Sequence, residues 1–275
     1  MEKIDVEKFL PAILNLPIVR VDRPTFLKKE LKPYYPEDVI ETAIAYSPAY
    51  AGIPKDFIDK AAKDVINYET TKVTALSFAA GLPGGFAMAG TIPADLTQYF
   101  TFILRVLQKL AYLYSFPEFD LNEDNLTEDT LNQLLVFLGV MWGVQGANAG
   151  LKMVAETLAR KLANDLPKKA LTKTALYPIV KKIAGVIGVN MTKQTFAKGA
   201  SKVVPVISGV ISGGLSYSTF KPSAKRLQKS LSLLPICDPN SEIYKNVKTD
   251  TDFANIYDEI FNSNEEQEET YAEET

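Results

Sequence analysis

The sequence predicts an all-α protein, built as a bundle of several closely packed helices. Three observations predict this fold: apolar residues recur at helical spacing, Gly/Pro clusters separate the helical segments, and no segment alternates apolar and polar residues as a strand would. With 275 residues, 47% of them apolar, the chain can bury a sizeable core. We divide it into an irregular N-terminal arm (1–35), a helical domain (36–249) and a disordered acidic tail (250–275).

The first convincing helix is expected to begin at Pro54, because proline suits the first position of a helix. Before it, the arm offers one short apolar helix around Val6–Leu14 and a segment at 18–21 with prolines on either side. Lysines and aspartates occupy the outer face of the Pro54 helix, which makes it an amphipathic surface helix. Its apolar face consists of Phe57, Ile58, Ala61, Ala62, Val65 and Ile66.

A Gly/Pro cluster ends this helical region and predicts a tight turn between packed helices. A phosphate-binding loop is the alternative, but the cluster lacks the Gly-Lys-Ser/Thr of a P-loop and no strand precedes it. A second helix is expected over 93–116, with Asp95 in its first turn, where a carboxylate stabilises the helix N-terminus. The cluster consists of Gly81, Leu82, Pro83, Gly84 and Gly85.

After an acidic loop at 122–130, residues 131–163 form one long helix or two in tandem. Within a single helix, the glycines of this segment would share one narrow stripe, because they are spaced four, three and four residues apart. Such a stripe lets a neighbouring helix approach closely, so we expect it to be a packing seam. The stripe consists of Gly139, Gly143, Gly146 and Gly150.

The second half of the chain is rich in lysine and in small residues. Short lysine-rich helical pieces are expected over 168–202, followed by a helix at 205–219 in which serines recur every four residues. A last helix is expected to begin at Pro222.

Charge is distributed unevenly along the chain. Residues 1–151 carry a net −6, residues 152–249 carry +13 and residues 250–275 carry −10, so the overall −3 hides a basic segment. Such a segment favours an anionic partner. Nucleic acid fits less well than lipid, because residues 152–202 contain only two aromatic side chains that could stack on bases. The candidate anion-binding residues are Lys168, Lys169, Lys181, Lys182, Lys225 and Arg226.

Three uncharged stretches, at 74–94, 131–151 and 203–220, are long enough to cross a bilayer as helices. Their prolines and glycines, side-chain amides and serines favour buried core helices instead. Partial insertion into a bilayer remains the alternative. The acidic N-terminus does not resemble a secretory signal.

The composition excludes much catalytic chemistry. Without histidine, the chain cannot form a Ser-His-Asp or Cys-His site or an imidazole metal site. The single cysteine, Cys237, excludes an internal disulfide and fits a reducing, cytoplasmic location. We predict no metal and no cofactor. A catalytic role for Asp95, in a hydrolase that pairs it with Glu41 or Asp64, is an alternative that no fixed spacing supports.

Two blocks of the sequence resemble the EcsC protein family of bacteria. The first joins the Gly/Pro cluster at 80–87 to the segment 92–96 and to a helix through Arg105 that ends at Tyr114. The family usually has glycine after this tyrosine, where this chain has Ser115. The second block is Lys202–Gly214, with Pro205, Gly209 and Gly213; the asparagine that often follows it is here replaced by Leu215-Ser216.

The resemblance spans about residues 50–230 and implies little chemistry. Family members are similar to a protein encoded beside an ABC transporter, and no catalytic residue or cofactor can be carried over. The first hypothesis is therefore a non-enzymatic protein on the cytoplasmic face of a membrane, held by its basic half and its glycine-rich helices. The second is an interaction module for a membrane-protein partner such as a transporter component, and the third is the carboxylate-dependent hydrolase.

Overall fold

The structure is a computed structural model, which describes residues 6–80, 94–121, 126–162, 176–186 and 205–245. Every regular element in this part of the chain is helical, which confirms the predicted all-α class. The longer helices are α1 (Val6–Leu14), α2 (Arg23–Leu31), α3 (Glu37–Ala45), α4 (Lys55–Ala80), α5 (Ala94–Leu113), α6 (Glu128–Met141), α7 (Ala147–Leu162) and α9 (Pro205–Ser232). Short elements are the 3-10 helices at Pro17–Val19 and Pro235–Cys237, α10 (Glu242–Lys245), and a further helix at 176–186.

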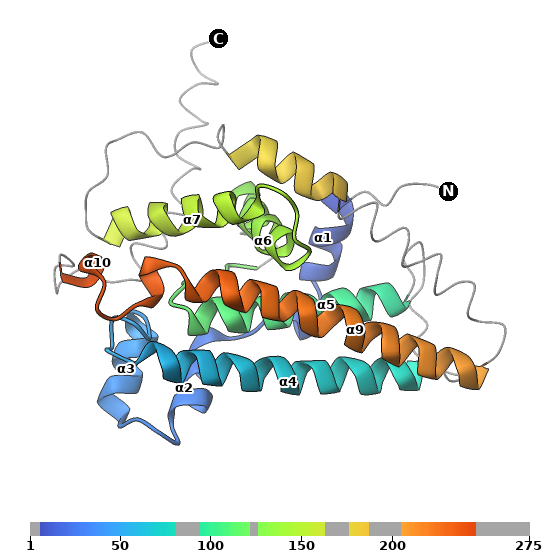
Figure 1. Cartoon of the computed structure of the whole chain (residues 1–275), viewed down its shortest axis with the longest axis horizontal. Helices are drawn as coiled ribbons and strands as arrows, with labels where there is room; N and C mark the ends of the chain where they lie inside the picture. The colour runs from blue at the N-terminus through green and yellow to red at the C-terminus, as the bar shows by residue number, and fades with distance from the viewer. Residues whose placement is uncertain (1–5, 81–93, 122–125, 163–175, 187–204, 246–275) are drawn as a thin grey trace, which may run out of the picture.

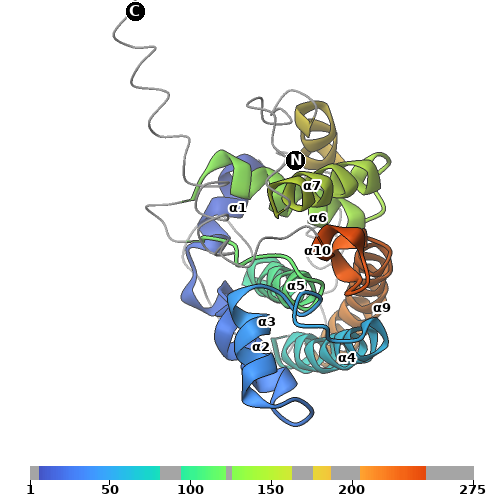
Figure 2. The same cartoon turned by 90° about the vertical axis from the view of Figure 1, so that its left-hand side faces the viewer.

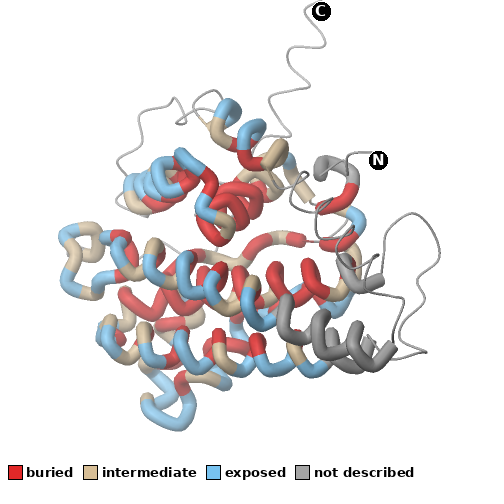
Figure 3. The backbone as a smooth tube through the Cα atoms, turned by 45° about the vertical axis from the view of Figure 1, so that its right-hand side comes forward, coloured by how far each residue is buried: buried red, intermediate tan, exposed pale blue. Residues whose placement is uncertain are grey.

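Three long helices, α4, α5 and α9, pack against one another and form the main group of the fold (Figure 1). α5 and α9 run in the same direction, and α4 runs antiparallel to both. α6 and α7 cover one side of this group, and α2 and α3 lie on the opposite side, as Figure 2 shows. Buried residues line the inward face of each helix, and exposed residues line the outer faces (Figure 3).

The prediction of an irregular arm over 1–35 is wrong. Residues 23–31 form α2, and α1 and α2 contribute fully buried side chains to the same core cluster as α4 and α5. The N-cap of α2 is Asp22, whose carboxylate accepts from the backbone N–H of Thr25 at 2.9 Å. Only Val6–Leu14 agrees with the expected short helix.

A buried arginine holds this N-terminal region in place. Arg23 follows the cap directly and is 6% exposed. Its guanidinium donates hydrogen bonds to four backbone carbonyls, three at the end of α3 and one after α5. The acceptors are Ala43, Ile44, Tyr46 and Phe116. A charged residue near the start of a chain is usually exposed, so the sequence pattern concealed this role.

The four glycines of the expected stripe have two different roles. Residues 131–163 form two helices, and Gly143 and Gly146 lie in the turn between them with φ of +66° and +94°. Gly143 ends α6 in a Schellman motif, in which Gly143 N donates to Val140 O and Val144 N donates to Gly139 O. The prediction that all four glycines form one packing seam is therefore wrong for Gly143 and Gly146.

The other two glycines do pack against a neighbouring helix. A Cβ on Gly139 would lie 2.6 Å from Ile183 Cδ1, and one on Gly150 would lie 3.4 Å from Ile179 Cγ2. Both isoleucines belong to the helix at 176–186. The small size of Gly139 and Gly150 thus lets this helix lie directly on α6 and α7.

Two helix boundaries differ from those expected. α9 is one helix over Pro205–Ser232, so Pro222 lies inside it rather than starting a new helix. Because Pro222 is on the exposed face, its missing N–H and its ring disturb the solvent side of α9 and not its packed side. α6 begins at Glu128, inside the expected loop, because Thr127 caps it by accepting from the N–H of Thr130 at 3.2 Å.

Candidate functional site

The helix at 176–186 has a buried apolar face and an exposed basic face. Val180 and Ile183 are buried, and Ile183 faces α6 while Ile179 faces α7. The exposed face combines aromatic, proline and lysine side chains. Its exposed residues are Tyr177, Pro178, Lys181 and Lys182.

Two candidate basic residues lie on either side of the turn between α6 and α7. Lys182 Nζ donates to Gln145 Oε1 at 3.0 Å. Arg226 Nη1 donates to the carbonyl of Met141, the last residue of α6, and its guanidinium lies 3.5 Å from the position that a Cβ on Gly143 would take. Arg226 therefore satisfies a helix end as well as contributing positive charge to the surface.

α9 adds a row of basic side chains along its outer face. Lys221, Lys225 and Lys229 recur every four residues, which places them on neighbouring turns of the helix. Tyr217 lies one turn before them, and Lys221 Nζ is 5.5 Å from its ring centroid. α7 meets α9 at one point, where Ser230 Oγ donates to Asn148 Oδ1 at 2.9 Å.

We call the basic residues of α7, the 176–186 helix and α9 the basic surface. These neighbouring helices carry eight basic residues and one acidic residue, Glu156, within residues 147–160, 176–186 and 217–234. Seven of the eight are exposed and Lys221 is half-buried. The basic surface consists of Lys152, Arg160, Lys181, Lys182, Lys221, Lys225, Arg226 and Lys229.

Only some of the other predicted site residues lie in the part of the chain that the structure describes. Asp95 lies in the first turn of α5, as expected, and three of the resemblance residues lie in the first half of α9. Six candidates lie outside the described residues. The α9 residues are Pro205, Gly209 and Gly213, and those outside are Gly81, Pro83, Gly84, Gly85, Lys168 and Lys169.

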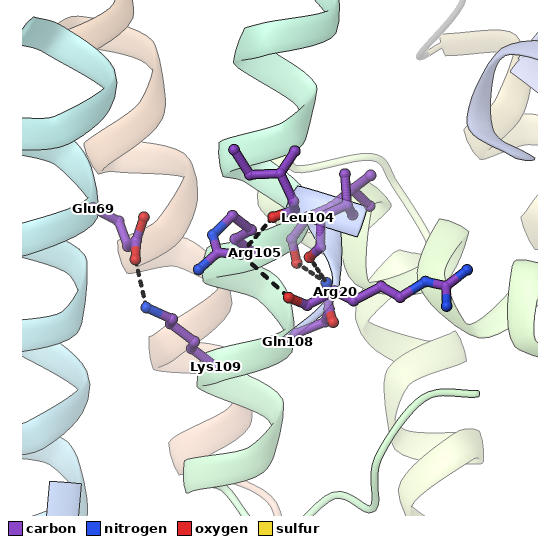
Figure 4. A network of polar contacts seen from close by, with 8 residues as sticks. Arg20, Glu69, Leu104, Arg105, Gln108 and Lys109 are labelled. Carbon is purple, nitrogen blue, oxygen red and sulfur yellow. Dashed lines mark hydrogen bonds and ion pairs between the residues drawn. The ribbon is translucent and has the colours of Figure 1, made fainter. Parts of the chain in front are cut away.

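Arg105 is a structural clamp. Its guanidinium donates to the carbonyls of Ile18 and Arg20, in the segment between α1 and α2 (Figure 4). One turn along α5, the buried amide of Gln108 donates to Val19 O at 2.9 Å and accepts from Val21 N at 3.1 Å. Together the two side chains hold residues 18–21 against α5.

A second cluster of positive charge lies around Tyr68 and was not predicted from the sequence. Three lysine ammonium groups lie within 6 Å of its ring centroid: Lys72 at 4.7 Å, Lys29 at 5.8 Å and Lys109 at 5.9 Å. The hydrogen bond from Lys72 holds the pKa of Tyr68 below its ordinary value. The lysines come from α2, α4 and α5, so only the four-residue spacing of Tyr68 and Lys72 is visible in the sequence.

Lys109 also neutralises a buried carboxylate. Its ammonium lies 2.5 Å from Glu69 Oε1, and the Glu69 side chain is 0% exposed (Figure 4). The second oxygen, Oε2, has no hydrogen-bond partner. This ion pair places Glu69 of α4 opposite Lys109 of α5 and so fixes how the two helices are aligned along their axes.

A second polar anchor joins α4 to both α5 and α9. Tyr114 OH donates to Asp59 Oδ1 at 2.5 Å, and Ser232 Oγ donates to Asp59 Oδ2 at 3.2 Å. Gln228 Nε2 donates to the Asp59 carbonyl at 2.9 Å. Burial and the neighbouring carboxylate raise the pKa of Tyr114 well above its ordinary value, so its hydroxyl stays protonated as a donor.

The structure does not bring Asp95 and Asp64 together. Asp95 precedes Lys109 by fourteen residues of α5, a helical length of about 21 Å, and Asp64 lies on the far side of the Glu69–Lys109 contact. That separation is too great for two carboxylates to share one substrate. Cys237 is buried, and its thiol donates to Tyr114 O at 3.0 Å. Burial raises the pKa of this thiol, which keeps it unreactive.

Within the described residues, no cluster of Cys, Asp and Glu side chains is suited to holding a metal ion. In the same part of the chain, no helix has both the length and the apolar character required to cross a bilayer. A scan against protein-family models, a search of the curated proteins and a search of the solved structures find no match to this chain. The resemblance to the EcsC family therefore remains a prediction from the residues quoted above.

Proposed function

We propose that the protein acts without catalysis at the cytoplasmic face of a membrane, where its basic surface binds anionic lipid. The observation that carries this proposal is the imbalance of eight basic residues against one acidic residue on three neighbouring helices. A solvated helical surface normally mixes both signs of charge, which avoids a large single-sign field.

The side chains of the basic surface suit a lipid headgroup region. Each lysine or arginine held near an anionic leaflet contributes about 1 kcal/mol, and several act together. Tyr177 lies one helical turn from Lys181, and both are exposed. Tyrosine favours the boundary between headgroups and hydrocarbon, so this pair combines an apolar and an electrostatic contribution.

Charge reversal on the basic surface tests the proposal. Lys181, Lys225 and Lys229 are exposed, and none of them makes the turn contacts of Lys182 or Arg226. Replacing all three with glutamate should abolish co-sedimentation with vesicles of phosphatidylglycerol and phosphatidylcholine at low salt. The matched control replaces three exposed lysines outside the basic surface, Lys32, Lys60 and Lys63, with glutamate.

The control has the same net charge as the test variant, so it separates a local surface from overall charge. We expect the control to keep most of its binding. Equal loss in both variants, or equal affinity of the parent for neutral and anionic vesicles, would contradict a specific basic surface. Binding of the parent to native membranes but not to protein-free vesicles would favour the membrane-protein partner instead.

A further inference from the structure

The acidic tail contains one stretch in which apolar residues recur at helical spacing. The intervals of three and four residues within 253–261 would place them on one face of a helix. Asp252, Asp258 and Glu259 fall outside that face, and the sequence 250–275 contains no lysine or arginine. We call residues 250–261 the acidic amphipathic segment. Its apolar residues are Phe253, Ile256, Tyr257, Ile260 and Phe261.

A helix of this length needs a surface on which to form. Isolated helices shorter than about 12–15 residues are marginal in water. An amphipathic peptide gains stability when its apolar face packs on a partner surface, which is a common mode of peptide recognition. Because the charges of this segment are all negative, the partner surface must be basic.

The basic surface offers both kinds of contact that the segment requires. It carries eight basic residues against one acidic residue, and the stems of lysine and arginine also provide apolar area. Large exposed apolar side chains lie on the same helices or directly after them, namely Tyr177, Tyr217 and Leu233. Leu233 is 72% exposed and follows Lys229 by four residues, so it continues the spacing of the lysine row on α9.

The lysine cluster around Tyr68 is a less suitable partner, because carboxylates accompany its lysines. Glu69 is paired with Lys109. Glu30 lies close enough to Lys29 and Lys109 for both to lower the pKa of its carboxyl, against the larger effect of burial. An acidic segment would meet these carboxylates as well as the lysines.

α10 determines where the acidic tail begins. Figure 2 shows α10 between α7 and α9, and α10 packs on α7. Tyr244 of α10 donates a hydrogen bond to the carbonyl of Ile236, and its ring centroid lies 6.1 Å from that of Tyr50. The chain therefore leaves α10 beside two of the three helices that carry the basic surface.

The connection is long enough for the segment to reach this surface. Phe253 follows Lys245, the last residue of α10, by eight residues, which can span at most about 29 Å. The lysine row from Lys221 to Lys229 is about 12 Å long. Because the segment is attached, its effective concentration at the surface is on the order of millimolar, so even a weak contact is populated.

We propose that the acidic amphipathic segment docks on the basic surface beside Leu233 and competes there with anionic lipid. The docking is a contact within the chain. The competition rests on the proposed function, because the segment and the lipid require the same basic side chains. A vesicle with enough anionic lipid displaces the segment, so docking sets how much anionic charge the protein needs in order to bind.

Two serines in the apolar face test docking without changing any charge. Ile256→Ser with Ile260→Ser keeps all the acidic residues of the tail. On vesicles of phosphatidylglycerol and phosphatidylcholine at low salt, this variant should bind at least fivefold more tightly than the parent. The matched control, Tyr271→Ser with Ala272→Ser, changes two uncharged residues of the tail outside the segment and should match the parent.

A fluorescent probe reports docking in the absence of lipid. Ala254→Cys lies within the segment and Ala272→Cys lies outside it; each is labelled with an environment-sensitive dye, while the buried Cys237 stays unlabelled. The probe at position 254 should emit at shorter wavelength than the probe at position 272. Charge reversal of the basic surface, by the three glutamates described above, should remove this difference, and the matched glutamate control should keep it.

The outcomes separate docking from the proposed function. Equal emission from positions 254 and 272 in the parent overturns docking, whatever the vesicles show. If the two serines leave binding unchanged while deletion of 250–275 tightens it, the tail acts by its total charge and the docked segment is overturned. If the probe reports docking but the protein binds no anionic vesicles, with or without residues 250–275, docking is supported and the proposed function is contradicted.

Discussion

Replacing Arg23 with methionine is expected to destabilise the protein by about 3–5 kcal/mol. The guanidinium donates to four backbone carbonyls at distances of 2.6–3.3 Å, and the side chain is almost fully buried. Methionine fills a similar volume but donates nothing, so the carbonyls lose their donor. A buried acceptor left without a partner costs about 1 kcal/mol or more. The sum is a large fraction of the roughly 5–15 kcal/mol that typically stabilises a protein.

Urea unfolding followed by circular dichroism measures this loss as a shift of the midpoint. Arg23→Lys should lose less than Arg23→Met, because an ammonium keeps the charge but cannot reach four carbonyls that spread around a planar guanidinium. Lys32→Met, at the exposed end of α2, is the control and should unfold like the parent. If Arg23→Met stays within about 1 kcal/mol of the parent, the N-terminal helices are not held as described.

Three further predictions concern stability. Gly143→Ala should destabilise the protein by about 1–2 kcal/mol, because position 143 has φ +66°, although a Cβ there would meet only ordinary contacts. Gly139→Ala should cost a similar amount for a different reason, since its Cβ would lie 2.6 Å from Ile183 Cδ1. In thermal melts, adding Ile183→Val should therefore restore stability to Gly139→Ala and not to Gly143→Ala. Burial raises the pKa of the Glu118 carboxyl above its ordinary 4.5, so the folded protein keeps this carboxyl protonated to a higher pH than the unfolded chain does. The free energy of unfolding should therefore fall as pH rises from 4.5 through the folded pKa. Urea titrations at several pH values should show that Glu118→Gln removes this fall. Lys109→Met should cost about 3–5 kcal/mol by leaving Glu69 charged and buried, and adding Glu69→Gln should recover part of the loss in the same assay.

The fold class followed from local patterns, because amphipathic spacing is set within each helix. The long helices α4 and α5 begin within one residue of the positions expected from Pro54 and Pro93. The N-terminal helices were harder to predict, because α2 depends on contacts between Arg23 and carbonyls about 20 and 93 residues away. A short window of sequence contains no trace of such contacts.

The glycine pattern shows why periodicity alone misleads. Four glycines at helical spacing are compatible with one long helix, but a Schellman motif also places glycine at its end and an apolar residue directly after it. Gly143 followed by the buried Val144 fits that motif, and this local signal was available in the sequence. Ser115 is the same case at the end of α5, with φ +67° where glycine is favoured; the EcsC resemblance had suggested glycine at this position.

The candidate site was predictable in part. Charge counting identified the basic segment, and Lys181, Lys182, Lys225 and Arg226 indeed lie at or near the surface. It could not separate side chains that only carry charge from those that also hold the fold. Arg226 ends α6, and Lys182 contacts the next turn, because these helices meet there. Such double roles depend on tertiary contacts, which a linear count of charges does not contain.

The antiparallel arrangement turns two separate sequence features into one. The uncharged runs after Lys72 and before Lys221 lie about 130 residues apart in the chain, and neither is long enough in a described helix to cross a bilayer. Antiparallel packing of α4 and α9 brings both runs to the same end and aligns the basic residues that limit them. The row of lysines on α9 then continues away from that end at intervals of about 6 Å, starting at Lys221. Charge on α9 therefore begins at Lys221 and continues along the basic surface to Lys229, while no charged residue precedes Lys221 in this helix.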